Sequence, residues 1–272
     1  MSFFRVLRAE FLKYFVQQFV TFRTAFWFLI LPFANGLLFY SMYLPFSNRL
    51  VPLNALGFNV AVDIVGFTLI GQLLYTFFVG MSVAGVQFDN ERSQGTFEAM
   101  LLTPASRMAI MLGVLFAAAA QYLWLIIGAV VTFLIFFRLP IILNDPSALV
   151  LSVFLTYTAL VSLGICLEAV FIHTRRGVML GTMLQEPIAF VSGTILPSSA
   201  FPPLFLQLTY LIPLTLGLIS VRLILLAGAT LGDVLLPVFG LLAMTLVLPL
   251  LGKWLISHAE ASAKAQGTVG LF

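Results

Sequence analysis

Long uninterrupted runs of apolar residues constrain the fold of this sequence more than any other feature. The hydrocarbon core of a bilayer is about 30 Å thick, and a helix needs about 20 apolar residues to cross it. The runs are continuous, whereas the strands of a membrane barrel alternate between apolar and polar residues. We therefore predict an all-α membrane protein, since a helix satisfies its own backbone hydrogen bonds within lipid. The six predicted spans cover residues 24–44, 64–88, 108–137, 148–172, 178–196 and 234–256.

The charge content supports this prediction. Charged residues make up only 8% of the chain, against roughly 25% in a typical soluble domain. Lipid must therefore cover most of the surface, and we treat residues 1–272 as a single transmembrane domain. A net charge of +3 without any run of Lys or Arg argues against a nucleic-acid partner. The single cysteine excludes an internal disulfide, and two distant histidines predict no metal site.

Residues 204–228, within the segment 198–228, are apolar and long enough to span a membrane, but the run carries several interruptions. Pro213 and Gly217 break the run, and Arg222 lies inside it. We predict a broken re-entrant segment, in which two short helices enter the membrane from the outer face and return. Irregular backbone at membrane depth must be buried in protein or line a cavity. The alternative is a seventh span.

The distribution of Lys and Arg predicts the orientation of the chain. With six spans and a cytoplasmic N-terminus, ten of these residues lie on the inner side and three on the outer side. This is the positive-inside bias of membrane proteins, and a seventh span would weaken it. We expect a multi-pass protein of the plasma (inner) membrane with both termini in the cytoplasm. The inner residues are Arg5, Arg8, Lys13, Arg23, Arg92, Arg107, Arg175, Arg176, Lys253 and Lys264, and the outer ones are Arg49, Arg138 and Arg222.

Residues 1–23 precede the first span and have a pattern of their own. Apolar residues recur there every three or four positions, which predicts a helix with one apolar face. Such a helix suits the inner membrane interface. The alternative is a basic anchor that only orients the first span. The apolar positions are Phe4, Leu7, Phe11, Phe15, Phe19 and Phe22.

Residues 89–107 form the only long charged stretch of the chain, and the predicted orientation places it in the cytoplasm. Thr96 can cap a short helix, Glu98 falls in its first turn, and Pro104 cannot continue it. A short amphipathic helix parallel to the membrane suits the docking of a soluble partner. The alternative is an ordinary solvated loop.

Two motifs point to a known family. The first runs from Glu91 to Pro104 and has a Glu-Arg pair before Gly-Thr, followed by Glu, a hydrophobic pair and Thr-Pro. The second comprises Glu186, Pro187, Val191, Ser192, Gly193, Pro197, Pro202, Pro203, Pro213, Leu214, Thr215 and Arg222. In motifs, spacing and six-span layout the sequence resembles the membrane subunits of ABC-2 type exporters, the class of lipo-oligosaccharide, polysaccharide and drug-efflux permeases. Val191 departs from the pattern, since that family more often has Leu there.

The resemblance implies a homodimer in which each copy binds a separate cytosolic ABC ATPase. ATP and Mg²⁺ would bind to that ATPase, and this chain would bind no cofactor. The segment 89–107 would be the coupling helix that rests on the ATPase, with the interfacial helix 1–23 beside it, and 198–228 would form the outer gate. The implied coupling residues are Glu91, Arg92, Gly95, Thr96, Glu98, Thr103, Pro104 and Arg107. The implied residues of the substrate path or gate are Glu186, Pro187, Ser192, Gly193, Pro197, Pro213 and Arg222.

The sequence itself supports the need for a separate ATPase. It contains no G-x-x-x-x-G-K-[ST] loop to hold a phosphate. Gly252 and Lys253 come closest, but Val247 replaces the first glycine and Trp254 replaces the Ser or Thr. We therefore expect a transport subunit without catalytic residues. Few charges are available to line its path, which favours an amphipathic or hydrophobic substrate such as a drug, a lipid or a lipid-linked glycan.

Two carboxylates lie inside predicted spans, where burial of a charge is costly. Glu186 is either a path residue or a hydrogen-bond partner that holds a helix broken by Pro187. Glu168 either forms a local ion pair with His173, Arg175 or Arg176, or takes part in transport. An ATP-independent carrier or channel that uses Glu186 or Glu168 is therefore the alternative function. The absence of an internal repeat argues against a carrier.

Overall fold

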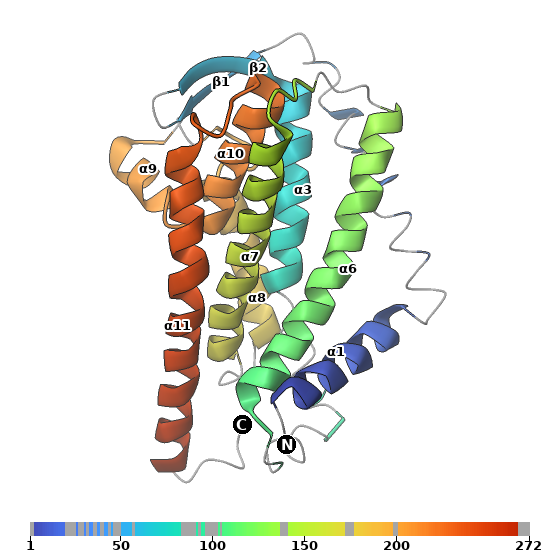
Figure 1. Ribbon diagram of the computed structural model, residues 1–272, viewed down its shortest axis with the longest axis vertical. Coiled ribbons are helices and arrows are strands. Elements are labelled where there is room, and N and C mark those ends of the chain that lie inside the picture. The colour runs from blue at the N-terminus through green and yellow to red at the C-terminus, as the bar shows by residue number, and fades with distance from the viewer. Residues whose placement is uncertain are drawn as a thin grey trace.

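The structure is a computed structural model that describes most of the helical part of the chain (Figure 1). It describes residues 3–19, 50–55, 58–82, 94–95, 105–136, 141–171, 177–197 and 201–265, with Glu91, Thr103 and isolated residues between 26 and 45. Helices run along the long axis, a strand hairpin covers one end, and helix α1 (Phe3–Phe19) crosses near the other. We call these two ends the hairpin end and the α1 end.

Four helices in the described part of the chain are long and apolar enough to cross a membrane. They are α3 (Ile64–Ser82), α6 (Arg107–Phe136), α7 (Pro146–Phe171) and α11 (Leu235–Ala265). Each begins within two residues of a predicted span. The 30 residues of α6 reach about 45 Å at about 1.5 Å per residue, so this helix must tilt to fit a bilayer. The chain is a multi-pass membrane protein.

Two predicted spans differ from this group. Span 24–44 lies almost wholly outside the described residues. Span 178–196 corresponds to α8 (Gly177–Val191), whose 15 residues reach only about 22 Å. The predicted end at residue 196 is therefore corrected to Val191. The physical reason is Gly193, whose φ of 87° lies in the left-handed region that turns the chain out of a helix.

The segment predicted to be re-entrant contains two helices, α9 (Pro203–Thr209) and α10 (Pro213–Ala227). Pro213 occupies the first turn of α10, where a missing backbone N–H costs no helical hydrogen bond. At the other end, Gly228 adopts a left-handed conformation with φ of 67° and caps the helix. Among the described helices, α10 is apolar but too short to count as a full span.

Strands β1 (Leu50–Ala55) and β2 (Phe58–Asp63) add an antiparallel hairpin to the helical architecture. Val51 pairs with Val62, and Leu53 pairs with Val60. Leu53 and Val62 are buried beneath the hairpin, because alternate residues of a strand point to one face. The helix-based sequence prediction did not anticipate these strands.

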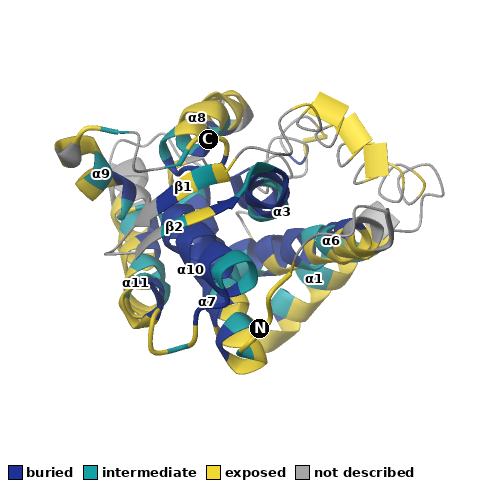
Figure 2. Ribbon diagram, turned by 90° about the horizontal axis from the view of Figure 1, so that it is seen from above, coloured by how far each residue is buried: buried dark blue, intermediate teal, exposed yellow. Residues whose placement is uncertain are grey.

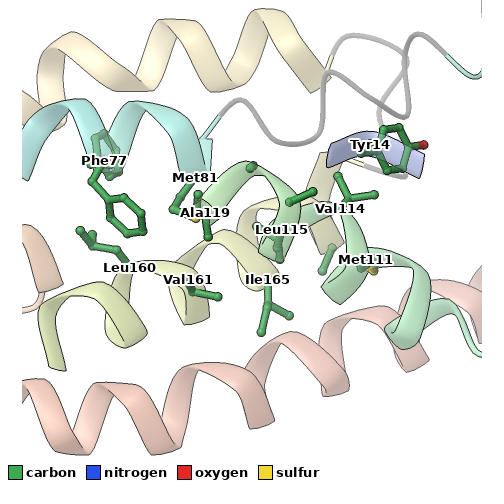
Figure 3. Close-up of a cluster of buried hydrophobic side chains, with 14 of the residues drawn as sticks. Tyr14, Phe77, Met81, Met111, Val114, Leu115, Ala119, Leu160, Val161 and Ile165 are labelled. Atoms are coloured by element: carbon green, nitrogen blue, oxygen red, sulfur yellow. The ribbon is translucent and has the colours of Figure 1, made fainter. Parts of the chain in front are cut away.

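Buried side chains gather in two clusters along the bundle. The α1-end cluster joins α1, α3, α6, α7, α10 and α11, and Figure 3 shows Tyr14, Phe77, Met111 and Leu160 within it. The hairpin-end cluster includes Leu53 and further residues of β2, α3, α7, α10 and α11. In lipid, such packing stabilises the fold mainly through van der Waals contact. Figure 2 shows α3, α7 and α10 largely buried, whereas α8 and α11 carry many exposed residues at the periphery.

Candidate functional site

The segment between α3 and α6 is attached to α1 through Glu91. Lys13 Nζ donates a hydrogen bond to Glu91 Oε1 over 2.5 Å, and Tyr14 O–H donates to the same oxygen over 3.0 Å. Glu91 and Tyr14 are both buried, whereas the side chain of Lys13 remains 44% exposed. A shared carboxylate oxygen therefore ties the predicted coupling segment to the predicted interfacial helix.

Helix α1 lies directly against the α1 end of α6. At Gly113 of α6, an added Cβ would lie 2.7 Å from Glu10 Cβ, 3.0 Å from Leu7 O and 3.2 Å from Phe11 N. Only glycine permits this close approach of the two backbones. Leu7 and Phe11 of the predicted apolar face pack against the α1-end cluster, whereas Phe4 of the same face is 79% exposed.

Two side chains of α1, Tyr14 and Glu10, have raised pKa values. Burial raises the pKa of the Tyr14 phenol far above its usual value, and the neighbouring Glu91 raises it further. Tyr14 therefore stays protonated and available as a donor. Burial also raises the pKa of Glu10, while Lys13 acts in the opposite direction. Lys13 Nζ lies 3.9 Å from Glu10 Oε2 and thus faces two carboxylates.

The remaining predicted coupling residues are only partly described. Gly95 is exposed in a turn with φ of 71°, and Thr103 is exposed. Arg107 begins α6, with its side chain outside the described part of the chain. The coupling helix itself stays a prediction. Arg92, Thr96, Glu98 and Pro104 lie outside the described residues.

A second group of predicted residues lies between α3 and α8. Tyr75 O–H of α3 donates a hydrogen bond to Glu186 Oε1 of α8 over 3.2 Å. Gln185 Nε2 of α8 donates to Ser82 Oγ of α3 over 2.9 Å. Glu186 and Pro187 are exposed on α8. The carboxylate of Glu186 therefore has a partner on α3 and still faces out of this chain.

The turn after α8 meets α10 through Arg222. Its Nη1 donates to Gly193 O over 2.6 Å, its Nη2 to Thr194 O over 2.8 Å, and its Nε to Phe67 O of α3 over 3.1 Å. Ser192 is buried beside this contact, with its Oγ 3.1 Å from Thr194 Oγ1. Of the predicted gate residues, the structure thus brings Gly193 and Arg222 together directly. Pro213 is buried at the start of α10, and Pro197 is half-buried after the turn.

Glu168 lies in the part of α7 nearest the α1 end and is only 1% exposed. Both of its carboxylate oxygens lack a hydrogen-bond partner among the residues that the structure describes. The predicted ion pair with His173, Arg175 or Arg176 involves residues outside that part of the chain. An ionisable group buried in this way is costly and is often retained for function.

Sequence reasoning did not assign a functional role to Lys13, Tyr14 or Phe67. Lys13 falls on the polar side predicted for residues 1–23, and a charged residue next to a tyrosine on a membrane-surface helix is only a weak signal of a polar contact. Phe67 contributes a backbone oxygen and its ring, so its residue type carried no signal of that role.

Comparison with known proteins identifies the class. The bundle of long apolar helices is that of a multi-pass membrane protein, and the family match supplies its role. Residues 1–226 match the ABC-2 type transporter family, and this chain belongs to that family. It is a membrane permease component of the ABC-2 type, a class that works together with an ABC ATPase. A comparison with curated proteins gave no significant match.

Proposed function

We propose that this chain is the permease subunit of an ATP-driven exporter, acting as a homodimer with a separate cytosolic ATPase. The complex moves an amphipathic or hydrophobic substrate, such as a drug, a lipid or a lipid-linked glycan, across the plasma membrane. Both termini face the cytoplasm, so that the α1 end is cytoplasmic and the hairpin end is external. ATP and Mg²⁺ bind to the ATPase and supply the energy.

The contact of Glu91 with α1 is the observation that carries this proposal. When the ATPase moves the segment 89–107, the hydrogen bonds from Lys13 and Tyr14 transmit that movement to α1. Helix α1 in turn contacts α6 at Gly113, without any intervening side chain of α6. A force on the cytoplasmic surface thus reaches a membrane-spanning helix through two short contacts.

The face of α8 that carries Glu186 supports a substrate path. A carboxylate at membrane depth needs protein or water around it, and Glu186 is exposed within this single chain. A second copy or an aqueous path therefore covers it in the assembled transporter. The neighbouring side chains Met183 and Phe190 are also exposed, so that this face offers apolar surface beside one polar group. Such a surface fits amphipathic cargo.

Co-purification from the native cells tests the proposal. The wild-type protein should bring an ABC ATPase with it, and ATPase activity should be measurable in the complex. Gly95→Pro should lose that ATPase, because proline cannot adopt the φ of 71° at this position. Gly232→Pro is the matched control, since Gly232 is exposed in a turn near the opposite end of the bundle.

Three outcomes separate the possibilities. Loss of the ATPase in Gly95→Pro alone supports the proposal and the position of the coupling segment. Equal retention in both variants shows that the coupling segment lies elsewhere. Transport that continues without any ATPase overturns the proposal in favour of a carrier that uses Glu186 or Glu168, which membership of the ABC-2 family argues against.

A further inference from the structure

Helix α8 is held in place by little apolar packing. Among the α8 residues whose burial the structure describes, only Gly181 and Ala189 are buried, and Ile188 is half-buried against the α1-end cluster. Its large apolar residues point outward, with Met179 50% exposed and Met183 61% exposed. Van der Waals contact with the rest of the chain therefore contributes little to the orientation of α8. The polar contacts of α8 therefore fix most of its orientation.

Polar contacts join α8 to α3 at three levels. Nearest the α1 end, Gln185 donates to Ser82, and the Glu186 carboxylate accepts from Tyr75. Each is a single hydrogen bond, and the Tyr75 contact is exposed. The third level, nearest the hairpin end, is the contact of Arg222 with the turn after α8.

The Arg222 contact is of a different kind from the other two. Its guanidinium donates to three carbonyl oxygens on two elements, and its Cζ lies 3.4 Å from the centroid of the Phe67 ring. The side chain is almost completely buried, at 2% exposure. Hydrogen bonds from a charged donor are about twice as strong as neutral ones. Partial negative charge at the C-terminal end of α8 and the aromatic face both favour the cation.

The backbone around Arg222 is shaped to admit it. At Gly71 of α3, an added Cβ would overlap Thr194 O of the turn and Nη2 of Arg222. Gly193 supplies one of the carbonyls from a left-handed conformation that favours glycine. Gly71 of α3, the turn at Gly193 after α8 and Arg222 of α10 thus form a single closely packed contact.

We propose that Arg222 is a positioning residue that fixes the hairpin end of α8 against α3, and that α8 turns about this end during transport. The contacts of Gln185 with Ser82 and of Glu186 with Tyr75 open and close as it does so. The buried three-point contact stays closed because its loss would leave a buried cation without acceptors and the turn carbonyls of Gly193 and Thr194 without this donor, whereas each of the other two contacts is a single hydrogen bond. This inference rests on the proposed transport function. It adds that α8 is the moving helix and that its hairpin end is fixed.

Distances between spin labels test the proposal in the complete complex within lipid nanodiscs. Native Cys166 is replaced by Ser, and labels are placed at Phe239 of α11 and either Met179 or Ile195, all of which are exposed. Labelled copies are diluted with unlabelled ones so that only distances within one chain are read. In the wild type, addition of nucleotide should shift the Met179 distance and leave the Ile195 distance unchanged. A shift of both distances would overturn the fixed end.

Variants at the contact provide the second arm, which is read without nucleotide and so does not depend on the ATPase. Arg222→Met removes all three hydrogen bonds and should raise the population with a displaced Ile195 at least about tenfold, since the loss of even one charge-assisted hydrogen bond has that effect. A merely structural role would lower the yield of folded protein but leave the distances of the folded fraction unchanged, and that result would overturn the proposal.

A second pair of variants keeps the test valid if Arg222→Met does not fold. Gly71→Ala retains Arg222 but places a methyl group against its Nη2 and Thr194 O, so that it should also displace Ile195. Gly66→Ala is the matched control on the same helix, because its methyl group meets the mobile end of Leu226. Equal Ile195 distances in the two variants would overturn the proposal. Failure of the nucleotide arm alone, with the variants behaving as expected, would instead count against the ATP-driven function.

Discussion

Replacing Gly113 by Ala tests whether α1 is held directly against α6. A methyl group at this position would face Glu10 Cβ at 2.7 Å and the backbone atoms Leu7 O and Phe11 N at 3.0 and 3.2 Å. None of these atoms is the mobile end of a side chain, so the whole of α1 must shift to make room. Gly128 on the same helix provides the control, because a methyl group there would meet no atom of the described residues within 4 Å.

The two variants should change stability in opposite directions. Within a helix, Ala is favoured over Gly by about 1 kcal/mol, and this gain applies at both positions. At Gly113 the methyl group also overpacks the contact with α1, which costs about 1–3 kcal/mol. Gly113→Ala should therefore be neutral or destabilising by up to about 2 kcal/mol, whereas Gly128→Ala should be neutral or stabilising.

Thermal unfolding of the purified protein in one detergent measures the difference. A change of 1 kcal/mol corresponds to about 2–4 °C in a protein of this size, so the two variants should differ by several degrees. Limited proteolysis supplies a local readout, since a displaced α1 should be cleaved faster in Gly113→Ala alone. Equal stabilisation by both substitutions, with unchanged cleavage of α1, would show that α1 does not lie on Gly113.

Three further outcomes are expected. Glu91→Ala leaves the buried Tyr14 hydroxyl without its acceptor and should cost about 1–3 kcal/mol in thermal unfolding, more than Tyr14→Phe; the reverse order would contradict the contact. The Ser147 hydroxyl, followed by backbone N–H groups, lowers the pKa of Asp145 below its usual 3.8. Stability from Asp145 is thus present above that usual value and lost as pH falls through the lowered pKa, so Asp145→Asn should flatten acid unfolding in that range, and an unchanged acid profile would refute this assignment. Glu168→Leu removes a buried carboxyl without a described partner and should raise stability by about 1–2 kcal/mol; lost transport with gained stability would give Glu168 a functional role, whereas lost stability would reveal a partner.

The sequence predicted the long helices well because their apolar runs are continuous. The starts of α6, α7 and α11 fall within two residues of the predicted spans. The end of α8 was placed too late, because the residues after Val191 remain largely apolar while the backbone turns at Gly193. The sequence analysis missed the hairpin because two strands of six residues give a weaker pattern than a long apolar run.

The contacts of the candidate site were less predictable than its residues. Glu91 stood out in the sequence as part of a family motif, and Glu186 and Arg222 stood out as charges within apolar runs. Their partners did not, because Lys13 and Tyr14 are 78 and 77 positions away from Glu91, and Arg222 binds backbone carbonyls, which every residue carries. The sequence thus indicated one residue of each contact, and its partner could be identified only from the structure.

The two clusters of buried side chains have a consequence for the order in which the protein is assembled during synthesis. Ile256 of α11 belongs to the α1-end cluster, and Val238 and Leu241 belong to the hairpin-end cluster. Helix α11 is the last of the described helices to leave the ribosome, so neither cluster is complete until it has entered the membrane. Until then α7 exposes to lipid a surface that α11 later covers, and a nascent chain stalled before residue 235 presents that surface to the membrane's quality-control proteases. The last helix therefore completes the packing of both ends of the bundle at once.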